Sequence, residues 1–360
     1  MKSKNLELAI QILVSTALGF SCGWIIEKSN VYQPATIRKQ MIFQDFILFK
    51  FFFAALATST LAILLISIIL KKSYNAAYEK HQSTLKYKSL AVIILGSFLL
   101  GMGIQIAGAS PIIVPVQLGA GFVYSAITFV GGLCGALVYG LCNPNIIQDA
   151  KGIASETIFS KNPALARSIA IVILGIIVFL MEYFMLWTKE NNTLPVSVYG
   201  MLLGTLQFFS ILFLNKSLGI SIAYSTLVAL PFVSKTFEEK YPYFAKLCTF
   251  DNLMTVIFFF SILLGSFVSS YTSGLFAKSL GIHPYNAFLG GFLIILGARM
   301  ADGCTIEHGI SGSAFQFIGS FVAIISIFLS AVIIGFHKTF NTQDVNSTQG
   351  VITGAPNKSG

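Results

Sequence analysis

Ala314-Phe-Gln-Phe-Ile-Gly-Ser-Phe-Val-Ala-Ile-Ile-Ser-Ile-Phe-Leu-Ser-Ala-Val-Ile-Ile-Gly-Phe-His337 contains no Asp, Glu, Lys or Arg. A transmembrane α-helix needs about 20 consecutive, mainly apolar residues, so this run predicts one. Eight earlier runs of similar character precede it. The nine predicted spans are Asn5–Ile26, Asp45–Leu70, Ser89–Ala107, Phe122–Cys142, Arg167–Trp187, Val196–Leu214, Asn252–Ala277, Pro284–Ala301 and Ala314–His337.

The composition of the 360 residues agrees with this pattern. Apolar residues make up 55% of the chain and charged residues 10%, and the mean hydropathy is +0.79. A soluble domain carries about 25% charged residues, which this chain cannot supply. A cytosolic enzyme, a nucleic-acid-binding domain and a disordered chain are therefore excluded. The composition predicts an all-α integral membrane protein.

The loop charges predict the orientation of the chain. With nine spans, loops on the side of the N-terminus carry 14 of the 23 Lys and Arg residues, and loops on the other side carry seven. Because cytoplasmic loops carry an excess of basic residues, we expect the N-terminus in the cytoplasm and a multi-pass protein of the cell membrane. We expect no cleaved signal peptide. Residues 338–360, rich in Asn, Thr, Gly and Ser, predict a disordered tail.

Four apolar segments are too short or too interrupted to span a membrane. They are Val31–Phe43, the stretch that follows Ser110, Gly219–Val233 and Thr305–Gly312. Irregular backbone at membrane depth persists only where it is buried in protein or lines a cavity. Short segments broken by Gly and Pro are therefore pointers to a transport site, and we expect re-entrant or broken helices here.

The two halves of the chain resemble each other. Leu100–Pro111 aligns with Ile294–Thr305 at an offset of 194, and Glu27–Ser29 aligns with Asn215–Ser217 at an offset of 188. Five spans precede the second copy, and an odd number inserts it upside down. We predict a first repeat with a linking fifth span over 1–187 and an inverted repeat over 188–337. The alternative is a chance similarity between glycine-rich membrane helices.

The densest polar run within the apolar sequence is Gly297-Ala-Arg-Met-Ala-Asp-Gly-Cys-Thr-Ile-Glu-His-Gly-Ile-Ser-Gly312. A charge at the bilayer centre costs roughly 2.5–3.5 kcal/mol, so Arg299 and Asp302, three residues apart, are expected to pair. A short helix starting near Gly303 would place Cys304 and His308 on one face. Free backbone N–H groups at its start would attract an anion. The alternative is a surface loop with solvated charges and an inert thiol.

Other chemistry is poorly supported by the sequence. The four histidines are well separated and no Cys-x-x-Cys pair occurs, so we expect no metal site and no cofactor. No phosphate-binding loop of the ATPase type is present. Cys22, Cys134 and Cys142 fit small apolar packing positions better than a path, and Cys248 lies in a charged loop. We do not expect disulfides.

The run Gly297–Gly312 closely resembles the signature of the YeeE/YedE family of sulfur-compound transporters. The opening of the chain is similar to the first repeat of that family, on Gly23–Ser29, Ile37–Gln40, Phe43-x-Asp45 and Phe49–Thr58. Asn215–Ser221 resembles the counterpart in the second repeat, and the resemblance covers most of Leu13–Gly335.

This resemblance implies an hourglass-shaped protein of inverted repeats that takes up thiosulfate or a related anion without a nucleotide. It implies that buried cysteines pass the anion along a narrow path. Cys304 matches the cysteine of the second repeat, and His308 lies in the same motif. Many members have Cys-Pro where this chain has Ser110-Pro111, and a further cysteine where it has Tyr32 or a neighbour.

The sequence therefore predicts a non-enzymatic transporter of a small sulfur-containing anion. One half of its site would comprise Gly303, Cys304, Thr305 and His308, with Ser110 on the other half and Arg299 stabilising the broken helix or the anion. One alternative is a sulfur relay, in which Cys304 forms a persulfide and passes sulfur to a cytosolic acceptor protein. Another is a membrane scaffold that transports nothing.

Overall fold

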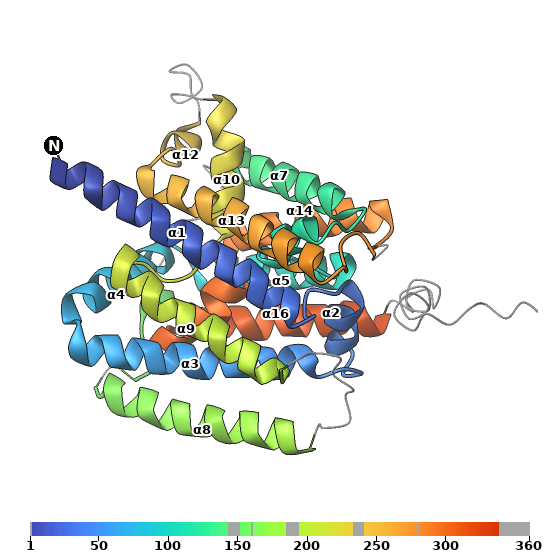
Figure 1. The fold of residues 1–360 in the computed structure, drawn as a ribbon. Helices are drawn as coiled ribbons and strands as arrows, with labels where there is room; N and C mark the ends of the chain where they lie inside the picture. Colours follow the sequence, from blue (N-terminus) through green and yellow to red (C-terminus); the bar gives the residue numbers. More distant parts are fainter. Residues whose placement is uncertain are drawn as a thin grey trace, which may run out of the picture.

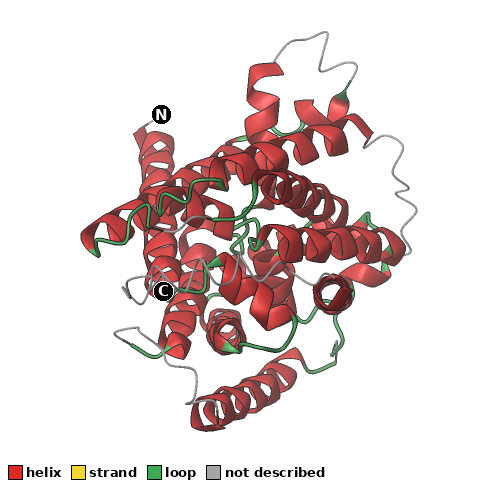
Figure 2. Ribbon diagram, turned by 90° about the vertical axis from the view of Figure 1, so that its right-hand side faces the viewer, coloured by secondary structure: helices red, strands yellow, loops and turns green. Residues whose placement is uncertain are grey.

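The computed structural model describes residues 2–142, 152–159, 161–184, 194–232, 241–278 and 281–337. In this part of the chain, Figure 2 shows helices joined by loops. Eight helices are long and apolar enough to cross a membrane, so the protein is an all-α, multi-pass membrane protein. The predicted end of the fifth span at Trp187 and the predicted tail lie outside the described residues.

The long helices follow the predicted spans closely. They are α1 (Lys2–Lys28), α3 (Ile47–Ile69), α5 (Leu90–Ala107), α7 (Ser125–Cys142), α8 (Pro163–Phe184), α9 (Val196–Leu214), α13 (Phe250–Thr272), α14 (Pro284–Ala301) and α16 (Ile318–His337). The sequence predicted nine spans, and α14 is the one not among the eight. Its polar first turn and Arg299 lower its hydropathy, although it forms a helix with the predicted bounds.

Short helices occupy the four segments predicted to be broken. They are α2 (Pro34–Met41), α6 (Ile113–Gly119), α10 (Ser221–Ala229) and the π-helix η4 (Glu307–Gly312), which continues into α15 (Ser313–Phe315). The remaining pieces are η2 (Ile153–Ser155), η3 (Leu230–Phe232) and α12 (Pro242–Ala245). The lysine-rich stretch counted above as a loop forms a further helix, α4 (Lys71–Lys86), which buries Ala77, His81 and Leu85.

The long helices pack in reciprocal pairs across the molecule (Figure 1). Helix α1 packs against α13 while α9 packs against α3, and α7 packs against α14 while α16 packs against α5. The first helix of each half therefore lies against a helix of the other half. The core consists of both halves together.

Helices α5 and α14 meet at the centre of this arrangement through glycines. A Cβ atom on Gly96 would lie 2.8 Å from the carbonyl oxygen of Gly297, and a Cβ atom on Gly103 would lie 2.7 Å from that of Gly290. Early residues of one helix face late residues of the other, so the pair is antiparallel. Small residues at such contacts let helix backbones approach closely in membranes.

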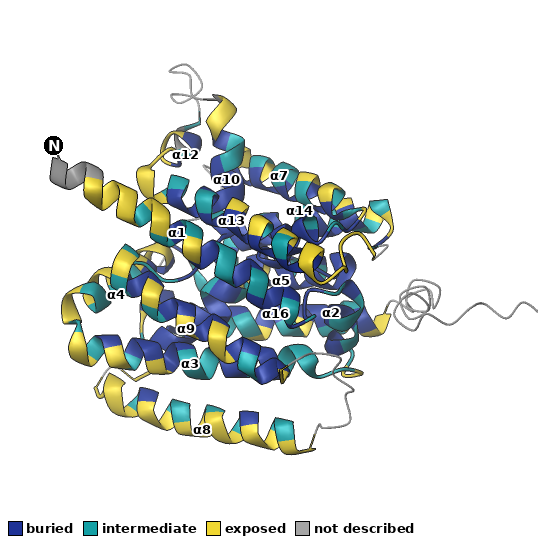
Figure 3. Ribbon diagram, viewed as in Figure 1, coloured by how far each residue is buried: buried dark blue, intermediate teal, exposed yellow. Residues whose placement is uncertain are grey.

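Helix α8 stands apart from the core. It lies at the edge of the molecule beside α3, and most of its surface is exposed (Figures 1 and 3). Polar contacts connect it to the neighbouring helices: the Arg167 guanidinium donates to the Tyr74 hydroxyl at 2.6 Å, and the Lys50 ammonium pairs with Glu182 at 3.2 Å. The outer face of α8 is apolar, as expected for a helix in lipid.

Candidate functional site

The two central helices end in the same way. The residue after α5, Gly108, and the residue after α14, Asp302, both adopt the left-handed conformation, with φ of 57° and 53°. This conformation closes a helix by returning its backbone N–H to a carbonyl of the last turn. The chain then turns sharply into α6 on one side and η4 on the other. Ser110 and Cys304 lie in these turns.

Cys304 directly precedes the helical turn that leads into η4, and its side chain is fully buried. Its backbone N–H donates to the Glu307 carboxylate at 2.7 Å. The expectation that N–H groups at this helix start are free for an anion is thus wrong for Cys304, because a side chain three residues later occupies that position. Reciprocal capping of this kind is common at helix starts. The thiol lies against the same turn, within hydrogen-bonding reach of the Ile306 and Glu307 backbone.

His308 and Gly303 support the turn. The His308 ring packs on Gly303, where a Cβ atom would lie 2.5 Å from Nε2. That nitrogen lies 3.2 Å from the Ala301 carbonyl oxygen, and Nδ1 lies 3.3 Å from the Ser320 hydroxyl. Both ring nitrogens therefore have protein partners, and His308 lines neither of the cavities described below. Its contacts are those of a residue that holds η4 against α14 and α16.

Arg299 is paired, as the sequence predicted. Its guanidinium donates to Asp302 at 3.1 Å, to the Ser221 hydroxyl at 3.2 Å and to the Tyr243 hydroxyl at 3.2 Å. Lys88 also pairs with Asp302, at 3.2 Å. The charge of Arg299 is compensated within the protein. The network connects α14 to α10 through Ser221.

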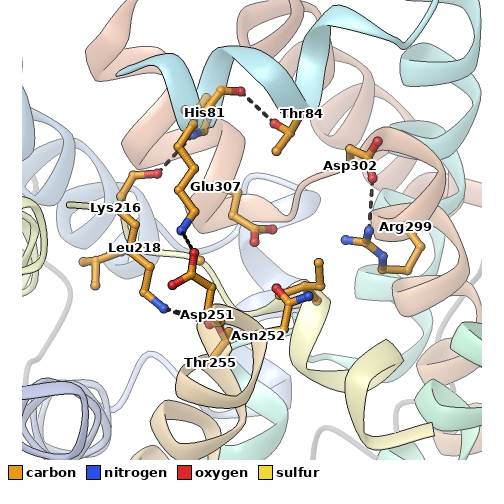
Figure 4. A pocket seen from close by; sticks show the side chains of 14 residues that line it. His81, Thr84, Lys216, Leu218, Asp251, Asn252, Thr255, Arg299, Asp302 and Glu307 are labelled. Carbon is orange, nitrogen blue, oxygen red and sulfur yellow. Dashed lines mark hydrogen bonds and ion pairs between the residues drawn. The ribbon is translucent and has the colours of Figure 1, made fainter. Parts of the chain in front are cut away.

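A polar cavity of about 180 Å³ lies next to this network (Figure 4). Glu307 lines it together with Arg299 and Asp302, and Lys80, Lys216 and Asp251 line the rest. Lys80 on α4 pairs with Asp251 on α13 at 2.5 Å. The Lys216 ammonium lies 3.3 Å from the Thr255 hydroxyl. Acidic and basic groups are mixed throughout this cavity.

Two groups of the polar cavity that lie outside the membrane-spanning helices, Lys216 and His81, have shifted pKa values. Desolvation, reinforced by repulsion from Lys80 and opposed by Asp251, lowers the pKa of Lys216 to about 8. Desolvation, with a smaller contribution from His308, lowers the pKa of His81 to about 3. His81 is therefore neutral at physiological pH, and Lys216 is the group there whose charge changes near it.

An apolar cavity of about 80 Å³ lies on the other side of the same segment. Its polar lining residues are Gln40 from α2, Ser110 and Thr305, and the others are aliphatic or aromatic. None of the described residues that line it carries a charge. Thr305 and Ile306 contribute to this cavity, whereas Glu307 contributes to the polar one. Residues 305–307, directly after Cys304, thus reach both cavities, whereas Cys304 itself lines neither.

Tyr224 on α10 connects the two halves near Cys304. It is fully buried, and its hydroxyl donates to the Pro111 carbonyl oxygen at 2.8 Å. It is also close enough to Cys304 for an electrostatic interaction with the thiol. Tyr224 therefore contacts both Pro111, which follows Ser110, and the turn at Cys304.

A model of the protein family described as "Sulphur transport" matches residues 28–333, which is most of the chain. The chain belongs to the sulphur transport family. No curated protein matches the sequence. Family membership and the eight apolar helices identify a multi-pass membrane protein of sulfur-compound transport.

This sulphur transport protein brings some predicted site residues together and separates others. Ser110 and Thr305 share the apolar cavity, and Cys304 lies in the adjacent turn. Arg299 lines the polar cavity instead, and Gly303 and His308 form the support behind the turn. The predicted set is therefore spread over two cavities and a supporting layer.

Sequence reasoning missed three residues of this region. Gln40 was noted only as part of a family motif, Glu307 only as one of several charges, and Tyr224 not at all. The spacing from Cys304 to Glu307 is that of a capping pair and could have identified the hydrogen bond. No local signal marks Gln40 or Tyr224, because their positions depend on packing between distant segments.

Proposed function

We propose that this protein carries a small sulfur-containing anion, thiosulfate or a close relative, across the cell membrane without a nucleotide. The observation that supports this most directly is the position of the Cys304 turn, which contributes residues to both cavities. An anion would pass from the apolar cavity, past the thiol, to the polar cavity. A thiol is polarizable and suits brief contact with a sulfur atom.

The proposed path also rests on an inverted repeat of 1–187 and 188–337. At the offset of 194, Gly103 aligns with Gly297 and Gly96 aligns with Gly290. The same alignment therefore superposes the contact of Gly96 with Gly297 on the contact of Gly290 with Gly103. A pseudo-two-fold axis in the membrane plane is expected to relate two antiparallel helices of this kind. Such an axis would place both turns near the membrane midplane.

The proposed orientation places the N-terminus and the polar cavity on the cytoplasmic side. Two basic residues of that cavity, Lys80 and Lys216, lie on the lysine-rich side of the chain. The apolar cavity then faces the outside, and an anion taken up meets it first.

The experiment that tests the proposal is uptake of radiolabelled thiosulfate into proteoliposomes that contain only this protein, with sulfite and selenium analogues as competitors. Cys304→Ser should lower the initial rate by about tenfold, because the smaller, less polarizable hydroxyl no longer contacts the passing sulfur atom. Cys142→Ser is the matched control, since that cysteine is exposed, and it should keep the wild-type rate.

Equal rates for the two serine variants would remove Cys304 from the path. No uptake of any sulfur anion by the wild type would refute transport. Mass spectrometry of the same samples tests the relay alternative, because a stoichiometric persulfide on Cys304 would indicate sulfur transfer. The full burial of Cys304 argues against direct attack by a cytosolic acceptor.

A further inference from the structure

Glu27 carries a buried carboxyl group at the end of α1 that lies opposite the N-terminus. It is 1% exposed, and none of the described Lys, Arg or His side chains forms an ion pair with it. One carboxyl oxygen accepts a hydrogen bond from the Ser269 hydroxyl of α13, and the other has no partner. Lys28, the next residue, instead donates to Ser273 and lies over the Trp24 ring, 5.5 Å from its centroid.

Few ionisable groups surround this carboxyl group. Lys28 and Tyr32 are close enough for an electrostatic interaction with it. The helices packed against α1 are α13, α9 and α6. Their ionisable side chains are Asp251 in the first turn of α13, the exposed Tyr271 near its end, and Tyr199 on α9; α6 has none. A carboxyl group held away from water without an ion-pair partner favours its neutral, protonated form.

Glu27 lies directly behind the wall of the apolar cavity. The residue before it, Ile26, lines that cavity, and so does Val31 in the loop that follows α1. None of the described lining residues carries a charge, so the wall screens a nearby charge weakly. At a separation of about 10 Å and an effective dielectric constant of about 20, repulsion between two single negative charges lowers affinity by about tenfold. A charged Glu27 therefore opposes an anion in the cavity.

We propose that Glu27 is a proton-binding site, and that a sulfur anion enters the apolar cavity while this site holds a proton. This inference rests on the proposed transport function and adds a condition for entry to the same path. The proton comes from solution and converts the carboxylate into a carboxylic acid, whereas the anion keeps its own charge. Because binding free energies are reciprocal, the proton strengthens anion binding by the factor by which the anion strengthens proton binding.

The first test measures proton uptake at equilibrium. The purified protein is titrated calorimetrically with thiosulfate at pH 5 to 7.5, in pairs of buffers that differ in their enthalpy of ionisation. Thiosulfate does not titrate in this range, so any proton taken up is bound by the protein. With a tenfold coupling, the uptake should reach about half a proton per bound anion at its maximum. Binding without proton uptake at any of these pH values would overturn the inference.

The second test compares two glutamates of the same helix. Glu27→Gln keeps an oxygen that accepts from Ser269 but cannot become charged, and Glu7→Gln makes the same change at an exposed position. In proteoliposomes, thiosulfate uptake by the wild type and by Glu7→Gln should be about tenfold faster at pH 5 than at pH 7.5. Glu27→Gln should keep the faster rate within about twofold at both pH values and should take up no proton on binding.

The outcomes separate the inference from the function on which it rests. If the wild type neither binds nor takes up thiosulfate, the transport proposal fails and the inference fails with it. If uptake occurs and Glu27→Gln keeps the pH dependence of Glu7→Gln, transport stands and the role of Glu27 is refuted. If Glu27→Gln does not fold, the proton uptake measured with the wild type still decides, since its absence alone contradicts the inference.

Discussion

Residues 305–307 contribute to both the apolar cavity and the polar cavity, but the two cavities differ in their charges. In the polar cavity, acidic and basic side chains pair across helices, as Lys80 does with Asp251. In the apolar cavity, none of the described lining residues is charged, and an amide and two hydroxyl groups are the polar lining. The lining changes from uncharged to charged between two adjacent residues, because Ile306 lines the apolar cavity and Glu307 lines the polar one.

This difference separates two tasks that a path for anions has to perform. Paired charges around water keep an anion soluble and attract it without holding it tightly. A dry cavity without charge admits an anion only when its dehydration is compensated by hydrogen bonds of suitable geometry. We therefore expect the apolar cavity to control which anion passes and the polar cavity to control how fast it leaves.

The largest effect should follow from adding a negative charge to one cavity or the other. Ser110→Asp should lower anion uptake by about 100-fold, because a charge in an apolar membrane site costs roughly 2.5–3.5 kcal/mol and repels the substrate. Thr84→Asp places the same charge in the polar cavity, where exposed charges interact weakly, and should cost less than about threefold. Initial rates in proteoliposomes measure both. Similar losses would erase the distinction between the cavities.

An intermediate effect should follow from removing the carboxylate between the cavities. Glu307→Gln keeps an oxygen that accepts from the Cys304 N–H but removes a negative charge next to the path. Uptake should rise by about threefold, because less repulsion opposes the anion as it passes. Glu307→Asp retains the charge and serves as the control, with no increase expected. A fall in the Glu307→Gln rate would show that the charge itself is needed.

The smallest effect concerns Lys216, whose pKa is lowered to about 8. Below this pH the ammonium is charged, and above it the polar cavity loses one positive charge, so uptake should fall by about two- to threefold between pH 7 and 9. Lys216→Arg keeps the charge and should flatten the profile. The same profile with Arg at this position would assign the pH dependence to another group.

The same shift has a consequence for stability with a defined sign. From pH 8 to the ordinary lysine value of 10.5, the unfolded chain holds a proton that the folded chain has lost. Because the unfolded state binds more protons, the free energy of unfolding attributable to Lys216 rises with pH across that window. Thermal unfolding of wild type and Lys216→Met at pH 7.5 and 10 checks this sign.

Much of the fold was predictable, because spans depend on local composition. The bounds of α9 and α14 match the predicted segments, and all four broken segments form short helices. The main omission is α4, where frequent lysines concealed a helix with a narrow buried face. Helix α8 was predicted as a span, but its packing at the edge of the molecule, mainly against α3, could not be predicted, since hydropathy does not show which face of a helix meets protein.

The candidate site was only partly predictable. The pairing of Arg299 with Asp302 follows from their separation by three residues, and the structure confirms it. The burial of Gln40 without a hydrogen-bond partner could not be deduced, because its amide is enclosed only after α2 packs against α5 and α3. Tyr224 acquires its partner at Pro111 from the other half of the chain. Contacts between distant segments leave no mark in local sequence.

The glycine contacts between α5 and α14 also limit how the protein can move. Their backbones touch at two points, so neither helix can rotate against the other without breaking the seam. We expect α5 and α14 to behave as one rigid unit to which each half contributes a helix. We therefore expect permeation to depend on side-chain rotations and on small shifts of the turns that follow α5 and α14. Rigid-body motion of one half against the other is not expected.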